Sequence, residues 1–342
     1  MKRFLFLGCF ILISIHGLAS KILIPMDDSQ ANHLKAYGVT FWVLGNGVEA
    51  QWLLNYRGGS FMLPNINNIA EECVIRGVSF QVIADVQAAQ ILNEISDSEV
   101  NMESVKLEKS PKIAVYSPAG KLPWDDAVTL VLTYAEIPYE IVYDEEVLSG
   151  VLPKYDWLHL HHEDFTGQFG KFYKAYRTAA WYQDEVDSQN ASASFMGFQK
   201  VSEMKREVSL TLRNFVLGGG FLFTMCSGTD SFDIALAAQD VDICDPMFDG
   251  DPSDSQANSK LNFSEGLAFQ DYNLEMDPLI YEFSNIDGTK DHRDIKQIND
   301  FFTLFDFSAK WDIVPTMLTQ SHKRVITGFM GQTTSFRKEF IR

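Results

Sequence analysis

Apolar and polar residues alternate along the N-terminal part of the chain in a way that predicts short strands and helices. Lys21–Ile24 and Val39–Leu44 are compact apolar runs that predict strands, and the polar segment Ser29–Tyr37 between them predicts a helix. The alternation continues through four more segments: Glu49–Leu54, Glu71–Arg76, Val78–Ile83 and a helix at Val86–Ile95. We therefore expect a small N-terminal α/β region over residues 21–96. The charged stretch 97–110 has little apolar periodicity and is expected to be a linker.

A clearer series of elements follows Pro111. Four short apolar runs predict strands: Lys112–Tyr116, Tyr139–Tyr143, Tyr155–Leu160 and Phe221–Met225, the last of them a central strand. Three segments with helical spacing of apolar residues alternate with them: Trp124–Ile137, Gln199–Leu217 and Thr229–Ala238. A further strand is expected within Arg324–Phe329. Strands that alternate with helices predict a parallel sheet wrapped by helices on both faces, here over residues 111–342.

The first twenty residues predict a cleavable secretion signal of bacterial type. Lys2 and Arg3 supply positive charge, Phe4–Ile15 is an apolar run too short to span a bilayer comfortably, and the small residues Ala19 and Ser20 suit cleavage. We therefore expect a periplasmic or extracellular protein that keeps no integral membrane span after cleavage. A retained N-terminal anchor is the alternative.

Composition and charge narrow the classes of partner. Of the 342 residues, 46% are hydrophobic, which is enough for one large or two moderate cores. Without Lys2 and Arg3, 26 basic residues face 46 acidic ones, so the mature net charge is −20. A nucleic-acid partner is excluded on this ground, because phosphates require a basic face. Three cysteines, Cys73, Cys226 and Cys244, follow the signal; an odd number leaves one thiol outside any intrachain disulfide, and a Cys73–Cys244 bond stays open.

The strongest chemical signal lies around Cys226. Gly218-Gly219-Gly220 ends a helix, Phe221–Met225 is an apolar strand, and a helix is predicted directly after Cys226-Ser227-Gly228. A strand, a sharp turn at a nucleophilic residue and an immediate helix form a nucleophile elbow, which aims the side chain at helix N-terminal amides. Cys226 is thus the candidate nucleophile, and the alternative is a buried structural cysteine.

This stretch, together with the strand Lys112-Ile113-Ala114-Val115-Tyr116, resembles the class I glutamine amidotransferase-like superfamily. The resemblance covers about residues 111–330 and implies a flavodoxin-like doubly wound sheet and a nucleophilic cysteine in Gly-x-Cys-x-Gly. Cys226 and Gly228 match that motif, whereas Thr224 replaces its first glycine. The family's late His-x-Glu pair is missing: only His292 and His322 follow Cys226, and the family's histidine would lie beyond the end of a truncated chain. Glutamine-dependent asparagine synthesis is excluded, since position 2 is Lys2 and no Ser-Gly-Gly-x-Asp-Ser loop occurs.

A second group of chemically active residues follows the strand Tyr155–Leu160: His159, His161, His162, Glu163 and Asp164. In doubly wound folds ligands gather at the carboxyl ends of strands, which makes this group a candidate binding rim. His161, His162 and Glu163 have the chemistry to ligate a divalent metal, although no metal is assigned, and His161 or His162 is the candidate general base for Cys226. The alternative is one histidine satisfied in the core and the others solvated. A third group, six aspartates in residues 240–254, is expected to be a solvated loop, with calcium as the alternative.

Two functions are therefore expected from the sequence. The first is an exported Cys-dependent amidase, in which Cys226 attacks a C–N amide bond and backbone amides near Ser227 and Gly228 hold the oxyanion. The second is a non-catalytic module that binds a small-molecule or peptide ligand, or a metal, at the rim formed by His159, Glu163 and Asp164. A loss of thiol reactivity would favour the second function.

Overall fold

The computed structural model describes residues 20–118, 127–288, 301–303, 309–310, 322, 325–327 and 335–342. The chain divides into two compact units, each described by itself below. Unit 1 comprises residues up to Lys109 together with Phe305–His322, and unit 2 comprises Ser110–Leu304 and Lys323–Arg342. The predicted signal up to Ala19 lies outside the described residues, and Ser20 begins the first strand. None of the described helices combines the length and apolarity needed to cross a membrane.

Unit 1 contains a five-stranded antiparallel sheet between helices. Its strands are β1 (Ser20–Ile24), β2 (Ala50–Leu54), β3 (Ser60–Pro64), β4 (Gln81–Ala84) and β5 (Glu103–Leu107), in the order β4-β1-β3-β2-β5. Helices α1 (His33–Gly45) and α2 (Asn67–Ile75) share a core with one face of the sheet, and α3 (Asp85–Ser96) packs on the other. Alternate strand residues such as Ile22 and Leu23 belong to different cores, as the two-residue period of a strand requires.

One expectation for this region is wrong. Val39–Leu44 lies inside α1 and is not a strand, because Ala36, Val39 and Val43 are buried together at helical spacing against the sheet. The segment Glu71–Arg76, whose type the pattern left open, lies within and just after α2. The expected linker 97–110 contains β5, whose Glu103–Leu107 pairs along the whole of β2. Backbone pairing of an edge strand needs little apolar periodicity, which is why the pattern did not reveal it.

A segment far along the chain completes unit 1. The amide of Ala309 donates to Asn101 Oδ1 at 2.8 Å, and Lys310 Nζ donates to the carbonyl of Ile95 at 3.0 Å. His322 stacks on His33 at 4.7 Å between ring centroids, and its Nε2 lies 2.7 Å from the Tyr37 hydroxyl. Burial and the neighbouring His33 lower the pKa of His322 to about 4.

Unit 2 is built on a four-stranded parallel sheet. Its strands are β6 (Ile113–Tyr116), β7 (Tyr139–Val142), β8 (Trp157–Leu160) and β9 (Phe221–Thr224), in the order β7-β6-β8-β9. The sequence therefore predicted all four strands and their parallel arrangement. Its placement of Phe221–Met225 at the centre is wrong, because β9 is an edge strand of the described sheet.

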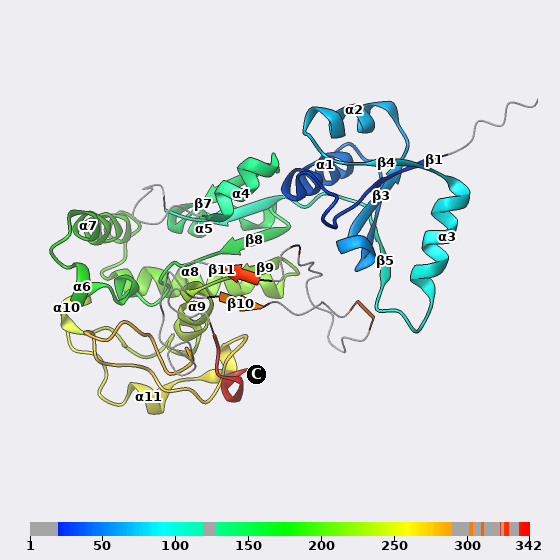
Figure 1. The fold of residues 1–342 in the computed structure, drawn as a ribbon. Coiled ribbons are helices and arrows are strands. Elements are labelled where there is room, and N and C mark those ends of the chain that lie inside the picture. Colours follow the sequence, from blue (N-terminus) through cyan, green and yellow to red (C-terminus); the bar gives the residue numbers. More distant parts are fainter. Residues whose placement is uncertain are drawn as a thin grey trace, which may run out of the picture. The chain divides into compact units, whose positions relative to one another are not determined.

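Helices and shorter elements fill the rest of unit 2. They are α4 (Ala127–Ala135), α5 (Asp144–Leu148), α6 (Tyr173–Tyr176), α7 (Ala180–Phe195), α8 (Val201–Leu217), α9 (Ser227–Ala237), α10 (Pro246–Asp249), α11 (Ala257–Lys260) and the ribbon of β10 (Phe301–Thr303) with β11 (Val325–Thr327). Helices α5, α8 and α9 share one core with the Ala114 and Leu158 face of the sheet, and α8 and α9 lie side by side in Figure 1. The strand expected within Arg324–Phe329 is confirmed as β11.

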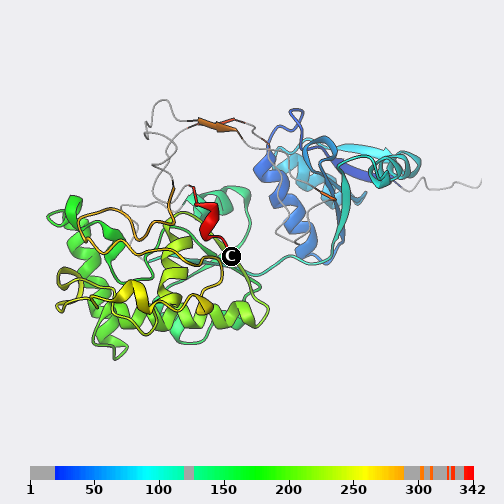
Figure 2. The same cartoon turned by 90° about the horizontal axis from the view of Figure 1, so that it is seen from below.

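The C-terminal residues return to unit 2 beside α9 (Figure 2). The amide of Gln270 donates to the carbonyl of Phe340 at 2.9 Å, and Asp233 of α9 accepts backbone N–H groups from residues 267–269. The irregular segment 267–269 is thus held on α9 by the buried carboxylate of Asp233, because its oxygens accept from three backbone amides.

A buried ion pair joins four elements at the carboxyl end of the sheet. Lys205 of α8 and Asp144, the first residue of α5, are each 1% exposed, with Lys205 Nζ 2.8 Å from Asp144 Oδ2. The hydroxyl of Tyr116, at the end of β6, donates to Asp144, and Lys205 Nζ lies 3.1 Å from that hydroxyl. Tyr143, directly after β7, places its hydroxyl 3.2 Å from the same ammonium. Each charge is therefore both paired and hydrogen-bonded, as burial requires.

Removing one member of this pair is expected to destabilise the protein strongly. Lys205→Met leaves the Asp144 carboxylate buried without its countercharge, a change that costs about 3–5 kcal/mol. The double variant Lys205→Met/Asp144→Leu should recover a large part of that loss, because no charge is left unpaired. Chemical denaturation gives the free energies of unfolding, with the exposed neighbour Glu207→Gln as control. Equal losses for the single and double variants would contradict the prediction.

A second prediction concerns the pH dependence of unit 1. Since the pKa of His322 falls from 6.5 to about 4 on folding, the unfolded chain takes up a proton between these values and the folded chain does not. Stability from the neutral imidazole is therefore present above pH 6.5 and is lost as the pH falls to 4, by about 1–3 kcal/mol. The free energy of unfolding of His322→Gln should therefore change less between pH 6.5 and pH 4 than that of the wild type. An unchanged slope in the variant would show that other groups cause this pH dependence.

Candidate functional site

The turn at Cys226 has the backbone geometry of a nucleophile elbow. β9 ends at Thr224, α9 begins at Ser227, and Cys226 between them has φ 50° and ψ −145°. Such a conformation costs a non-glycine residue about 1–3 kcal/mol and is concentrated at functional sites. The predicted strand, sharp turn and immediate helix are therefore confirmed, and Cys226 caps the N-terminus of α9.

Contacts with the end of β8 hold this turn in place. The amide of Met225 donates to the carbonyl of Leu160 at 3.0 Å and so continues the β8–β9 pairing to the edge of the turn. One step further, the amide of Gly228 donates to the carbonyl of His161, also at 3.0 Å. A Cβ at position 228 would lie 2.6 Å from that carbonyl oxygen, so only glycine permits this approach.

The environment of the Cys226 sulfur keeps the thiol protonated. Burial is the largest cause that raises its pKa above the ordinary value of 9.0, and the negative charges of Asp230 and Asp287 act in the same direction. Hydrogen bonds from the amide and hydroxyl of Ser227 oppose the shift without reversing it. A preformed thiolate is therefore absent near neutral pH, and a nucleophilic role requires a base.

The turn after β8 carries the histidines and carboxylates. The amide of His161 donates to Glu163 Oε2 at 3.0 Å, and the Nδ1 atoms of His161 and His162 are 3.1 Å apart. A hydrogen bond at that separation requires one Nδ1 to donate and the other to accept. Asp164 accepts from the amides of Thr166 at 2.7 Å and Gly170 at 3.0 Å, and thereby shapes the loop that follows.

Both turns lie at the same edge of the sheet, and they contact each other through backbone oxygens. The Ser227 hydroxyl donates to the carbonyl of His162 at 3.1 Å, and the Ser231 hydroxyl donates to the carbonyl of Glu163 at 2.9 Å. Elements far apart in the sequence are thus brought together as the sequence predicts. The proton transfer between Cys226 and His161 or His162 stays a prediction.

His159 has a different position from the other members of the predicted rim. It lies within β8, is 2% exposed, and its ring packs 5.5 Å from Phe223 and 6.2 Å from His161 between centroids. His159 is therefore a covered residue of the strand and not part of an open rim. Glu163 is also buried, at 7% exposure, whereas His162 and Asp164 are half-buried.

The two amides expected to hold an oxyanion make different contacts. The Gly228 amide donates to the carbonyl of His161, so it is engaged in holding the turn. The Ser227 amide hydrogen-bonds to the Cys226 sulfur. The oxyanion role of both residues stays a prediction.

A pocket opens where three strands end. Ser117 follows β6, Tyr143 follows β7, and His162, Glu163 and Asp164 follow β8. Opposite these strand ends, α7 contributes Trp181, Tyr182, Glu185 and Gln189, and the loop after Asp164 contributes Phe169, Gly170 and Phe172. The chain adds β7 on one side of β6 and then β8 on the other side, so the strand order reverses beside β6. Ligands bind at such points in open α/β sheets.

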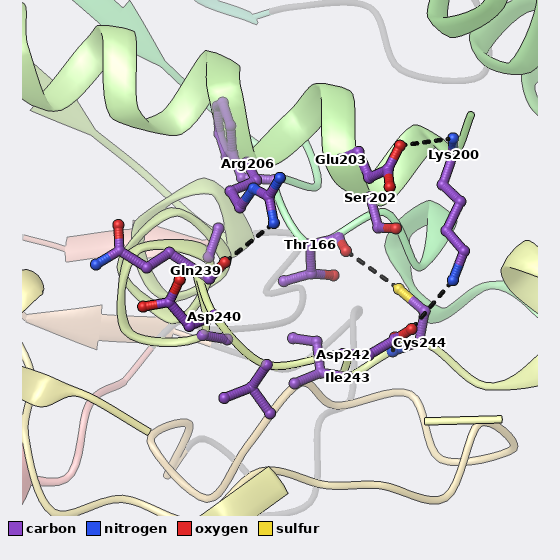
Figure 3. Close-up of a pocket in the computed structure, with 14 residues that line it drawn as sticks. Thr166, Lys200, Ser202, Glu203, Arg206, Gln239, Asp240, Asp242, Ile243 and Cys244 are labelled. Atoms are coloured by element: carbon purple, nitrogen blue, oxygen red, sulfur yellow. Dashed lines mark hydrogen bonds and ion pairs between the residues drawn. The ribbon is translucent and has the colours of Figure 1, made fainter. Parts of the chain in front are cut away.

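The aspartate-rich loop forms a separate cluster. Asp242, Cys244 and Asp249 bring three ligand atoms within 4.8 Å of one another, the only such set among the residues described. Lys200 Nζ pairs there with Asp242 and Asp249, both at 3.1 Å, and supplies a positive charge. Figure 3 draws Lys200 and Asp242. Two members of this cluster, Asp242 and Cys244, line a pocket between α8 and the loop (Figure 3), which has a volume of about 340 Å³. No metal is assigned from the sequence at His161, His162 and Glu163, and the possibility of a divalent metal there stays open.

The other two cysteines have no bond to each other. Cys73 is buried in unit 1 and Cys244 is buried in unit 2, and both are free thiols. Burial raises the pKa of Cys73 to about 11 and that of Cys244 well above its ordinary value. They are structural cysteines, and Cys226 is the more accessible thiol of the three.

Several residues of this edge were not found from the sequence. Lys205 lies on the apolar face of α8, four residues after Val201, and a lone lysine at such a position signals a buried partner. Asp144 directly follows a predicted strand, which is the same signal that drew attention to His161. Trp181 and Glu185 of α7 carried no signal, because they approach the sheet only through the tertiary fold.

Comparison of the chain with protein-family models, with curated proteins and with solved structures found no match. The resemblance to the class I glutamine amidotransferase-like superfamily therefore depends on the residues around Cys226 and on the strand series from Lys112.

The close approach at Gly228 yields a prediction. Gly228→Ala places a methyl group against the His161 carbonyl, so the two turns must separate at a cost of about 1–3 kcal/mol. Thiol accessibility at Cys226 should rise in the same variant, since Ser227 moves with Gly228. Thermal unfolding and thiol titration measure the two effects. Thr229→Ala, one residue along α9, is the control; a Gly228→Ala variant as stable as this control would contradict the prediction.

Proposed function

We propose that this protein is a thiol-dependent hydrolase of C–N amide bonds with Cys226 as its nucleophile. The observation that carries the proposal is the left-handed backbone of Cys226 at the junction of a parallel strand and a helix N-terminus. A half-buried cysteine is not otherwise expected to occupy a strained conformation, and the strain presents its sulfur beyond the sheet edge.

The reaction proceeds through a covalent thioester. The Cys226 sulfur attacks the amide carbonyl carbon while its proton passes to the imidazole of His161 or His162. The carbonyl oxygen becomes an oxyanion that the Ser227 amide stabilises, and the protonated imidazole then returns the proton to the departing amine nitrogen. Water, deprotonated by the same imidazole, breaks the thioester and regenerates the thiol. A base is needed at the first step because burial raises the pKa of Cys226.

The strand order gives fold-level support for this assignment. The order β7-β6-β8-β9 agrees with a flavodoxin-like arrangement in which the first strand lies between the second and third. In the resembling superfamily the base follows the nucleophile in sequence, whereas here it would precede it, in the turn after the neighbouring strand β8. Triads with different chain orders arise repeatedly, so the departure in order is compatible with the chemistry.

The alternative is a binding module on the same fold. It is favoured by the raised pKa of Cys226 and by the engagement of the Gly228 amide with His161, because neither feature assists catalysis. Its ligand would occupy the pocket at the strand ends. A secretion signal in residues 1–20 would place either activity in the periplasm or outside the cell.

A direct test measures thiol reactivity and hydrolysis on the full chain. Iodoacetamide should label Cys226 before Cys73 and Cys244, with a rate that rises with pH toward values above 9, because the thiol pKa is raised. Glutamine and a panel of aminoacyl p-nitroanilides serve as amide probes, and release of ammonia or nitroaniline is measured. Cys226→Ser should abolish any turnover, whereas Cys73→Ser should leave it unchanged.

Two results would overturn the catalytic proposal. One is a Cys226 that stays unlabelled until the protein is denatured. The other is equal hydrolysis by the wild type and Cys226→Ser, which would assign the turnover to a different group or to a contaminant. Either result would favour the binding module.

A further inference from the structure

The pocket at the ends of β6, β7 and β8 has a wall of aromatic rings. Trp181 meets Phe172 and Tyr182 edge to face, each at 5.9 Å between centroids, and Tyr182 meets Phe169 in the same way at 6.4 Å. Tyr143 contributes a fifth aromatic side chain from the sheet side. Rings that support one another edge to face stay in place without a ligand, so the wall is preorganised.

The charged side chains among the described residues of this pocket are all carboxylates. Glu163, Asp164 and Glu185 line it, and among its described lining residues there is neither lysine nor arginine. The nearby ammonium of Lys205 is already paired with Asp144. Burial is the largest cause that raises the pKa of Tyr182 to about 12 and that of Tyr143 well above its ordinary value, and the negative charges of Asp164 and Glu185 act on both in the same direction.

The segment that carries part of the aromatic wall is strained. Phe169, Gly170 and Lys171 have φ values of 50°, 67° and 57°, three successive left-handed residues. Two contacts hold them: Asp164 accepts from the amide of Gly170, and the buried Lys171 Nζ donates to the carbonyl of Glu275 at 2.8 Å. Strain of this kind persists where surrounding contacts enforce it, and it is concentrated at ligand-binding segments.

From the rings, the carboxylates and the pocket they line, we infer that this pocket binds an organic cation, an ammonium or guanidinium group attached to an apolar body. Aromatic faces attract a cation through their quadrupoles, and Glu185 and Asp164 supply the opposite charge. The apolar body would lie against Trp181 and Phe172. The inference goes beyond the proposed hydrolysis, because binding here does not require the thiol of Cys226.

Benzylamine, a cation at neutral pH, tests the inference against benzyl alcohol, which has nearly the same shape without charge. Titration of the full chain, followed by tryptophan fluorescence and calorimetry, should show saturable binding of benzylamine at least about tenfold tighter than binding of benzyl alcohol. Glu185→Gln should weaken benzylamine about tenfold and leave benzyl alcohol unchanged. Asp187→Asn, an exposed carboxylate on the same helix, is the matched control and should leave both affinities unchanged.

Cys226→Ser should bind benzylamine as the wild type does, so failure of catalysis and failure of this inference are distinguishable. Three outcomes would overturn the inference: no saturable benzylamine binding up to about 10 mM, equal affinity for the alcohol, or an equal effect of Glu185→Gln and Asp187→Asn. Tighter binding of benzoate than of benzylamine would also reject it.

Discussion

The buried pair of Lys205 and Asp144 is the interaction on which the functional edge of unit 2 depends. It joins α8 and α5 to the ends of β6 and β7 through the hydroxyls of Tyr116 and Tyr143. An ion pair without contact with water must have its hydrogen bonds satisfied, so it permits few alternative arrangements of the strand ends. Tyr143 lies both in this network and in the pocket, which connects the packing of the core to the shape of the site.

On the neighbouring strands the same edge is fixed by backbone atoms. The Gly228 amide and the Ser227 and Ser231 hydroxyls bind the carbonyls of residues 161–163, so α9 begins at a set distance from the histidine turn. These contacts explain how the strained Cys226 conformation persists. The cost of its positive φ is offset by contacts on both sides of the residue.

The sequence predicted those features of the fold that depend on local pattern. The four strands of the parallel sheet, α8 and the elbow at Cys226 follow from apolar runs and from glycine placement. The error at Val39–Leu44 has a physical cause: a short apolar run fits a strand or a buried helix equally well, and only packing on the sheet decides between them. β5 was missed because its partner β2, and not its own composition, makes it a strand.

The functional residues divide in the same way, into those that a local pattern reveals and those that only the tertiary fold reveals. Cys226 and the His161–Asp164 turn could be found because chemically active residues directly follow predicted strands, where parallel sheets place ligands. The carboxylate of Glu185 and the ring of Trp181 reach the same edge from α7, which the sequence leaves unplaced, so only the tertiary fold reveals them. Their presence changes the interpretation of the site. A rim of histidines and carboxylates alone is equally suited to a metal or to a proton relay, whereas carboxylates opposite an aromatic wall favour a ligand that is both apolar and positively charged.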